Sequence, residues 1–487
     1  MKLPTLSSDP MAALSQIGMA LSDLMTPTVR LGVTGLSRAG KTVFITALVN
    51  CLCEGRAEPA FRRIARIPGF RAYLEPQPDD DIPRFAYEDH LEALFAETPR
   101  WPESTRKISQ LRLTLEWPAQ DSVREAFGLT QRLHIDIIDY PGEWLIDLGL
   151  IEQSYEQWSA DALFTAQSKG LEIYSRDFLA FLERTDTAAS LDEQVAIEGA
   201  RIYTDYISRA RKAEPSRAAL GPGRFLLPGD LEGSPQLTFF PTRRPERSAG
   251  GAGGHTTRDL LRRRYEKYKQ NVVQPFFEKH FSRLDRQIVL IDALSSLNGG
   301  AEALSNLEQG LDGVMSAFRP GSNSWLSFLL PRRIDRIVFA ATKADHIHHT
   351  SHNRLEAILD KAVSRASTRA KTAGAGFRSV ALAALRTTED VDKTAGEQTY
   401  HCIRGVPEKG ESVGGQVFDG KRPAVVFPGD LPIDPLDAFD PAKATPEDYR
   451  FVRFRPPPAI SEPNGKPIWR HIGLQRAIAF LIEDYLP

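Results

Sequence analysis

The chain has little of what defines several large classes of protein. Only three of its 487 residues are cysteines, Cys51, Cys53 and Cys402, which is too few for a disulfide framework and is typical of a reducing cytosol. No apolar run approaches the roughly 18 to 20 residues that span a bilayer, and the first residues lack the basic flank and apolar core of a secretory signal. The formal net charge of −2 gives no broad attraction to nucleic acid or anionic lipid. We therefore expect a cytoplasmic protein, and we expect no nucleic acid among its partners.

The first 27 residues carry an amphipathic pattern. Apolar side chains recur at helical spacing between Met11 and Met25. We therefore predict a helix within residues 1–27 that packs against the domain that follows. The segment lacks the Lys and Arg that membrane-surface helices carry, so peripheral membrane contact is an alternative without support from the composition.

The strongest pattern lies between Val29 and Leu52. An apolar run that favours a β-strand leads into GLSRAGKT, and a helical apolar pattern follows at once. Strand, glycine loop and helix in that order are the context of a Walker A motif, whose backbone N–H groups hold phosphate oxygens. We expect Lys41 to contact the β- and γ-phosphates and to act in catalysis, and Thr42 to bind Mg²⁺. The other predicted nucleotide contacts of this loop are Gly35, Ser37, Arg38, Ala39, Gly40 and Val43.

A second motif, DYPG, ends the apolar strand LHIDII. An aspartate at the carboxyl edge of a central strand lies beside the phosphate loop, so we expect Asp139 to hold Mg²⁺ through water. The backbone N–H of Gly142 is then placed to contact a γ-phosphate. The motif is weak alone, and its position one strand after a Walker A motif is what makes it significant.

A third motif, TKAD, follows the apolar strand RIVFAA. It matches the pattern with which GTPases recognise guanine. Asp345 can accept hydrogen bonds from the ring N1–H and the exocyclic amine, while the stem of Lys343 can cover the purine face. We expect Thr342 to tie this loop to the phosphate loop, and His346 to be a further nucleotide contact. The next apolar strand ends at the small-residue loop Ala383, Ala384 and Leu385, whose backbone N–H groups are expected to meet the guanine O6.

The four motifs occur in the order expected of a P-loop GTPase. Two more apolar segments fit the same domain. Residues 108–117 alternate as an antiparallel edge strand would, and residues 287–294 are nearly all apolar, as an internal parallel strand would be. The predicted fold is therefore α/β: a Ras-like P-loop domain with a mostly parallel sheet, one antiparallel edge strand and helices on both faces. Its expected cofactors are GTP or GDP with Mg²⁺.

Two residues are further candidates for catalysis. Glu143 follows Gly142 directly, at the position where many GTPases place a glutamine that orients the attacking water. A carboxylate can align water or act as a base, but it also adds negative charge near the γ-phosphate. We therefore predict slow intrinsic hydrolysis, or hydrolysis completed by a partner or a dimer. Thr105 is the candidate switch threonine, with Ser104 and Thr98 as alternatives.

The GTPase domain is predicted to be discontinuous. A mainly helical insertion and a small insertion rich in Gly and Pro, with short strand-like pieces, interrupt it. The predicted GTPase segments are 28–149, 286–389 and 471–487, with 55–103 as an extended first switch region, and the insertions are 150–285 and 390–470.

Some segments carry more than one interpretation. Four histidines occur in HIHHTSHN, directly after TKAD. Metal binding is one interpretation, because histidine is a common ligand, and a helix start with polar side chains near the base or an insertion is the plainer one. The basic runs at 262–264 and 332–333 are interpreted as solvated or ion-paired. The apolar WLSFLLP at 325–331 is interpreted as a covered core segment.

Several longer stretches resemble the YcjX-like family of stress-associated P-loop proteins of Gram-negative bacteria. The resemblance rests on GLSRAGKTVFITALVN, LHIDIIDYPGEWLIDL and ATKADHIHHTSHNRLEAI, and on FPGDLP and VRFRPP near the end. It covers nearly the full chain. It implies a cytoplasmic, Ras-like domain that binds GTP and GDP, family-specific insertions, and a link to the envelope-stress response through an unidentified protein partner.

Three functions remain open at this point. The first is a Mg²⁺-dependent GTPase that acts as a switch. The second is an ATPase or kinase-like P-loop enzyme in which TKAD is incidental. The third is a nucleotide-stabilised adaptor with negligible turnover, whose insertions bind a stress-related partner.

Overall fold

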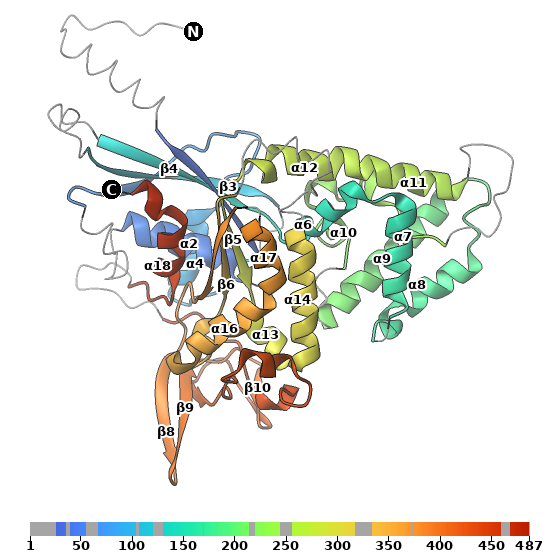
Figure 1. Ribbon diagram of the computed structural model, residues 1–487. Coiled ribbons are helices and arrows are strands. Elements are labelled where there is room, and N and C mark those ends of the chain that lie inside the picture. The colour runs from blue at the N-terminus through green and yellow to red at the C-terminus, as the bar shows by residue number, and fades with distance from the viewer. Residues whose placement is uncertain are drawn as a thin grey trace, which may run out of the picture.

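A computed structural model describes most of the chain (Figure 1). The described residues are 26–35, 39–54, 67–103, 107–119, 130–168, 170–213, 220–243, 256–316, 334–372, 374–458 and 468–486. Several predictions lie outside them: the helix within residues 1–27 apart from its last two residues, the loop residues Ser37 and Arg38, the switch candidates Ser104 and Thr105, and the segments 325–331 and 332–333.

A seven-stranded sheet forms the centre of the molecule, in the order β2-β3-β4-β1-β5-β6-β7. Its strands are β1 (Thr28–Gly35), β2 (Arg71–Glu75), β3 (Ser109–Pro118), β4 (Thr130–Asp139), β5 (Arg286–Ile291), β6 (Arg336–Ala341) and β7 (Gly376–Ala381). Strands β4, β1, β5, β6 and β7 are parallel, while β3 is antiparallel to β4 and β2 is antiparallel to β3. The predicted α/β fold with a mostly parallel sheet is confirmed.

The antiparallel strand predicted for residues 108–117 is present as β3, but it does not lie at the edge. Strand β2 pairs outside it, with Ala72 opposite Leu115. The hydroxyl of Tyr73 also donates a 2.8 Å hydrogen bond to Glu116 on β3. Because β2 has only five residues and none of them is fully buried, it lacks the apolar alternation that reveals a strand in sequence.

Helices cover both faces of the sheet, and the strands show why. Along β6, Val338 and Ala340 belong to one apolar core, while Ile337 and Phe339 belong to the other. This alternation is the period of two that places successive side chains on opposite faces. The first core includes side chains of α2 (Lys41–Cys53), α4 (Tyr87–Phe95) and α18 (Leu474–Ile482), and the second those of α13 (Ala293–Asn298), α14 (Gly300–Ser316), α16 (His352–Ala362) and, in part, α17 (Ser364–Thr372).

Between β4 and β5 the chain forms a set of helices at one end of the molecule (Figure 1). They are α6 (Glu143–Leu148), α7 (Tyr155–Ala166), α8 (Glu172–Arg184), α9 (Glu193–Ala213), α10 (Gly223–Leu226), α11 (Thr257–Tyr268) and α12 (Gln274–Lys279), with a short π-helix, η5 (Lys269–Val273), between the last two. They share a core of their own that is rich in aromatic side chains. In it Trp158 stacks on Tyr265 with ring centroids 5.2 Å apart. None of the helices within the described residues is long and apolar enough to cross a membrane.

His280, at the end of α12, makes this helical region sensitive to acid. Burial lowers the pKa of His280 to about 4; the charge of Asp79 opposes this shift, and the cations Lys279 and Arg283 assist it. Between that value and the ordinary pKa of about 6.5, the unfolded chain binds a proton that the folded chain does not. The free energy of unfolding therefore falls as the pH decreases through this window, by about 2 kcal/mol for this residue after allowance for partial exposure.

Replacing His280 by Gln is expected to remove this contribution. Urea unfolding at about pH 7 and about pH 4.5 should then show a smaller loss of stability on acidification than in the unmodified protein. Lys267→Gln, at an exposed position on α11, removes a charge that does not titrate in this range and serves as the control. Equal pH dependence in the His280→Gln variant and the unmodified protein would contradict the prediction.

After β7 the chain forms a second, smaller sheet in the order β12-β9-β8. Its strands are β8 (Glu389–Ala395), β9 (Gln398–Gly405) and β12 (Ala424–Val426), and a separate short hairpin joins β10 (Ser412–Val413) to β11 (Gln416–Val417). The β8–β9 hairpin projects away from the main sheet (Figure 1). Its tight turn needs the left-handed backbone of Gly396, with φ of 64°, which glycine adopts without a steric penalty.

Candidate nucleotide-binding site

Two glycines, Gly35 and Gly40, flank the loop between β1 and α2. Gly40 precedes α2 with φ of 86°, a conformation that favours glycine. A side chain at Gly35 would lie 2.7 Å from the carbonyl oxygen of Leu290 on β5. The side chain of Lys41 is buried and its Nζ donates a 3.0 Å hydrogen bond to Gly35 O. The ammonium group is therefore held at the end of β1, beside the start of α2.

The DYPG segment lies against the same loop. Val33 on β1 is opposite Asp139 on β4, and Asp139 is buried at the carboxyl edge of its strand. The Gly142 N–H, expected to contact a γ-phosphate, donates a 3.3 Å hydrogen bond to Gly35 O. One carbonyl oxygen thus accepts from both Lys41 and Gly142.

The TKAD motif follows β6, and hydrogen bonds from Thr387 fix the carboxylate of Asp345. Asp345 is buried, and its Oδ2 accepts hydrogen bonds from the Thr387 N–H at 2.7 Å and the Thr387 hydroxyl at 2.6 Å. Lys343 has φ of 60° and its Nζ forms an ion pair with Asp292. The Thr342 hydroxyl donates to Ile291 O on β5 at 3.3 Å. We expected Thr342 to connect this loop to the phosphate loop, but its hydroxyl forms a hydrogen bond with β5 instead.

The small-residue loop after β7 is anchored by the C-terminal part of the chain. Ala383 and Ile472 exchange backbone hydrogen bonds of 2.9 and 2.8 Å, and the Trp469 Nε1–H donates to Ala384 O at 2.6 Å. The Ala383 N–H is thus occupied by Ile472. Of the three residues predicted to meet the guanine O6, Ala384 and Leu385 remain as candidates.

A cavity of about 340 Å³ connects the phosphate loop, the TKAD loop and the small-residue loop. This is within the usual range for small-molecule sites. Predicted contacts that line it are Ala39, Gly40, Lys41, Thr42, Val43, Lys343, Asp345, His346, Ala383, Ala384 and Leu385. Gly35, Asp139, Gly142 and Glu143 are not among the lining residues. Thr98 is the alternative switch threonine that lies within the described residues. It is exposed and lies three residues before Trp101.

One wall of the cavity comes from residues outside the four nucleotide-binding motifs, two of them in the VRFRPP stretch. Trp101, Glu408, Arg453 and Phe454 line it. The Trp101 Nε1–H donates a 2.9 Å hydrogen bond to Phe454 O, and the Phe454 ring meets the edge of His346 with centroids 5.1 Å apart. Burial lowers the pKa of His346, so this ring is neutral at neutral pH. The segment after β9, the segment around Phe454 and the segment before β3 therefore enclose this side of the cavity.

Glu143 lies in a different environment from the one expected of a water-orienting residue. Its side chain is 3% exposed and its Oε1 lies 3.3 Å from Nη2 of Arg211 on α9. Gly223 packs against the backbone here, since a Cβ at that position would lie 2.0 Å from Glu143 O. Burial lowers the pKa of Arg211, and the charges of Glu143 and Asp147 oppose that shift. The residue after DYPG is therefore joined to the helical region.

Comparison with known proteins fits this geometry. A family model described as the YcjX-like family matches residues 29–486. The chain belongs to this family. It is similar to the Ras-like GTPase YcjX of Escherichia coli (strain K12), with 35% identity over 475 residues, 94% of this chain and 96% of the relative. It is also similar to the Ras-like GTPase YcjX of Shewanella oneidensis (strain MR-1), with 31% identity over 476 residues and 94% of both chains. The resemblance to the YcjX-like family is thus confirmed.

Within this family member, sequence patterns missed the residues that support the motifs. Thr387 fixes Asp345 across 42 positions, Asp292 pairs with Lys343 across 51, and Arg211 reaches Glu143 across 68. Each contact depends on how strands and helices pack rather than on local spacing. Of these supporting residues, only Asp292 has a recognisable sequence signal, because it directly follows the apolar strand β5 at the same edge of the sheet as the motifs.

Proposed function

We propose that this YcjX-like protein binds GTP and GDP with Mg²⁺, hydrolyses GTP slowly, and acts as a nucleotide switch in the cytoplasmic response to stress. The observation that carries the proposal is the cavity bounded at one end by Lys41 and Thr42 and at the other by Asp345. A lysine at the first turn of a helix suits phosphate, and a buried carboxylate at the far end suits a guanine. The names of the two relatives support the same function.

The phosphate end would use groups from three segments. Backbone N–H groups at the start of α2, including those of Gly40 and Lys41, would hold the phosphates. Thr42 would bind Mg²⁺ directly, and Asp139 would hold it through water. An acidic group beside a hydroxyl is a suitable donor set, because Mg²⁺ prefers oxygen ligands.

The purine end would select guanine over adenine. Thr387 donates to Oδ2 of Asp345, which orients the carboxylate so that Oδ1 can accept from guanine N1–H and the amine. The N–H of Ala384 or Leu385 would meet O6. Adenine offers no such donors to the carboxylate and would leave Oδ1 without a donor from the base. The ATPase alternative is therefore the weaker one.

The shared acceptor at Gly35 suggests how nucleotide state would change the structure. Lys41 Nζ and the Gly142 N–H both donate to Gly35 O, and both are groups that a γ-phosphate attracts. Binding of GTP would draw them away from this carbonyl and move the start of α6. Through Glu143 and Arg211 that movement would reach α9, so the helical region is the proposed reporter of the nucleotide state.

Slow turnover follows from the position of Glu143. A carboxylate held by Arg211 is poorly placed to orient water, and if it were released it would add negative charge near the γ-phosphate. The same observation favours the second candidate function, an adaptor with negligible hydrolysis. In both cases the protein partner related to stress would bind the insertions.

The proposal predicts a clear nucleotide preference. In Mg²⁺-containing buffer, GTP and GDP should displace a fluorescent guanine nucleotide at least about 100-fold more effectively than ATP, because a hydrogen-bonding site rejects a base that leaves it unpaired. Lys41→Met should weaken binding of both guanine nucleotides, since Nζ is expected to contact the phosphates. Equal displacement by GTP and ATP would refute guanine recognition, and absence of binding by either guanine nucleotide would refute the proposal as a whole.

A further inference from the structure

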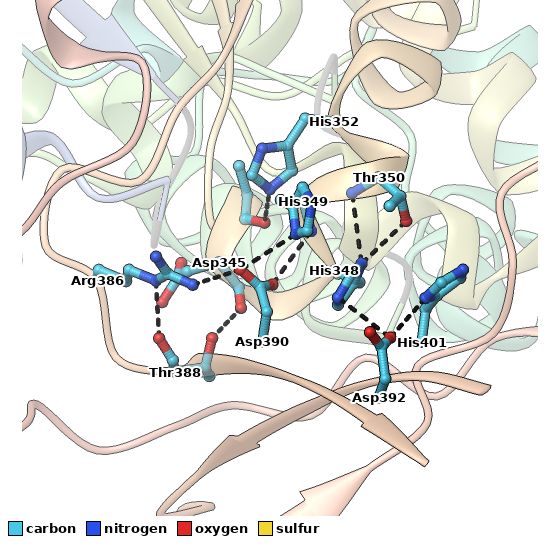
Figure 2. Close-up of polar contacts among 11 residues, drawn as sticks. Asp345, His348, His349, Thr350, His352, Arg386, Thr388, Asp390, Asp392 and His401 are labelled. Carbon is cyan, nitrogen blue, oxygen red and sulfur yellow. Dashed lines mark hydrogen bonds and ion pairs between the residues drawn. The ribbon is translucent and has the colours of Figure 1, made fainter. Parts of the chain in front are cut away.

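Outside the nucleotide cavity, histidines and aspartates from two parts of the chain meet below the TKAD loop (Figure 2). His348 precedes the short helix η8 (His349–Ser351) and is 4% exposed. Asp392 on β8 and His401 on β9 are directly paired across the hairpin. Figure 2 shows both imidazoles directed toward the Asp392 carboxylate. Side chains separated by up to 53 positions are therefore gathered at one point.

Their donor atoms have nearly the spacing of a metal site. The ligand atoms of His348, Asp392 and His401 all lie within 4.8 Å of one another. Nε2 of His348 is 3.6 Å from Asp392 Oδ1, and Nδ1 of His401 is 2.8 Å from the same oxygen. Around a tetrahedral zinc ion, with bonds of about 2.0 to 2.1 Å, neighbouring donor atoms are about 3.3 Å apart. The two distances to Asp392 each lie within about half an ångström of that spacing, so modest side-chain shifts would bring the carboxylate and the imidazoles to it.

We propose that His348, Asp392 and His401 bind a divalent transition-metal ion, with zinc as the best match. Two imidazoles and one carboxylate form a ligand set that suits zinc, whereas Mg²⁺ and Ca²⁺ prefer oxygen ligands throughout. The site is separate from the Mg²⁺ position proposed beside Thr42. It uses none of the residues that line the nucleotide cavity, so it does not rest on the proposed function.

A neighbouring hydroxyl can hold the His348 ring in the orientation that metal binding requires. Its Nδ1 lies 2.9 Å from Thr350 Oγ1. With the ring proton on Nδ1, this nitrogen donates to Thr350 and Nε2 presents a lone pair toward Asp392. A hydrogen bond of this kind at the second nitrogen orients metal-binding histidines in general. The longer contact of 3.4 Å from the Thr350 N–H to Nδ1 would then be lost.

A neighbouring group offers an alternative that the contacts disfavour. His348, His349 and Asp390 also lie within ligand distance of one another. Asp390, however, already forms a 2.7 Å ion pair with Arg386 and accepts a 3.1 Å hydrogen bond from the His349 N–H. A metal ion there would have to compete with a guanidinium. The Asp392 carboxylate contacts only imidazoles among the described residues.

An ion at this position would fasten the β8–β9 hairpin to the GTPase core. His348 is three residues after Asp345 in the loop that follows β6, while Asp392 and His401 lie on the projecting hairpin. The site is thus a structural clip between two parts of the chain. Since the ion would bind the folded state, it should raise the melting temperature.

The test is metal binding by the full chain, treated with a chelating resin and kept free of nucleotide and Mg²⁺. Competition between the protein and a chromogenic chelator should show uptake of one Zn²⁺ per chain, with a higher melting temperature. Co²⁺ should give the visible absorption of a tetrahedral site without the intense near-ultraviolet band of thiolate ligands. His348→Ala, His401→Ala and Asp392→Asn should each weaken Zn²⁺ binding by about tenfold or more.

Matched control variants distinguish this site from the neighbouring group of His348, His349 and Asp390. His349→Ala and Asp390→Asn, in the neighbouring group, and His90→Ala, on α4, should leave Zn²⁺ affinity unchanged. Far-ultraviolet circular dichroism of each variant reports folding. The proposal is overturned if folded protein takes up no Zn²⁺, if Co²⁺ shows thiolate ligation, or if His349→Ala and Asp390→Asn abolish binding while His401→Ala does not.

Discussion

Replacing Asp345 by Asn is expected to turn a guanine-binding protein into one that prefers xanthine nucleotides. In the proposed complex Oδ1 of the carboxylate accepts from two donors of guanine, and an amide NH₂ group in its place cannot accept. Thr387 fixes the orientation, because its N–H and hydroxyl both donate to Oδ2. In the variant the single amide oxygen would stay with Thr387, and the NH₂ group would face the purine.

That orientation explains the direction of the change. The NH₂ group opposes both guanine donors, whereas it can donate to the carbonyl oxygen that xanthine carries at C2. Affinity for GDP should fall by at least about 100-fold, as expected when a buried polar site is left unpaired. Affinity for xanthosine diphosphate should rise above that for GDP. Both are measured by titration calorimetry, and binding of the xanthine nucleotide itself demonstrates that the variant is folded.

Thr387→Val supplies the matched control. It removes one charge-assisted hydrogen bond behind Asp345 while keeping the carboxylate, so GDP binding should weaken by only about tenfold and guanine should remain preferred. Unchanged GDP affinity in the Asp345→Asn variant would mean that TKAD does not recognise the base, and the ATPase interpretation would then be favoured.

The strand β1 and its neighbours show how much of the candidate site could be predicted from the sequence. Gly35, Gly40 and Lys41 could be predicted to lie close together because strand, loop and helix are contiguous in the sequence, and the structure places Lys41 Nζ 3.0 Å from Gly35 O. The same holds for Asp139 and Asp345, each of which follows or ends an apolar parallel strand at one edge of the sheet. These are the positions where local pattern and global fold agree.

The remaining contacts depend on tertiary packing and could not be predicted from the sequence. Nothing near Trp101 indicates that its indole donates to Phe454 O, 353 positions later, and nothing near Asp345 indicates Thr387. Strand β2 was missed because its pairing with β3, rather than its own pattern, makes it a strand. Glu143 was assigned by analogy of position, but a helix that begins more than 40 residues later, α9, determines what its carboxylate meets.

The Glu143–Arg211 pair gives the second large effect. Arg211→Met would remove the positive charge of Arg211 beside a buried carboxylate, 3% exposed. Loss of one partner of a buried ion pair costs about 3 to 5 kcal/mol. We expect a decrease of that size in the free energy of unfolding, measured with urea near neutral pH. Glu143→Gln should cost less, because a neutral amide tolerates burial better than an isolated charge does.

The double variant distinguishes a charge effect from lost packing. When Glu143→Gln and Arg211→Met are combined, neither side chain is charged and the volumes are nearly kept. The unfolding free energy should then return to within about 1 to 2 kcal/mol of the unmodified protein, since replacing a buried pair by neutral groups is often close to neutral. The coupling energy of the cycle measures the pair itself. Additive losses would show that packing, and not the charge pair, joins α6 to α9.

Single-turnover measurements of phosphate release from GTP, made with the same variants, distinguish a structural role of Glu143 from a catalytic one. If Glu143 aligns the attacking water, Glu143→Gln alters the rate even when its stability is little changed. If the rate is unchanged, Glu143 leaves the mechanism, and its pair with Arg211 remains as a link through which the DYPG segment moves the helical region. In that case Arg211→Met should leave hydrolysis intact while removing the nucleotide dependence of hydrogen exchange in α9. A nucleotide effect on α9 that survives the loss of Arg211 would exclude this route between the two regions.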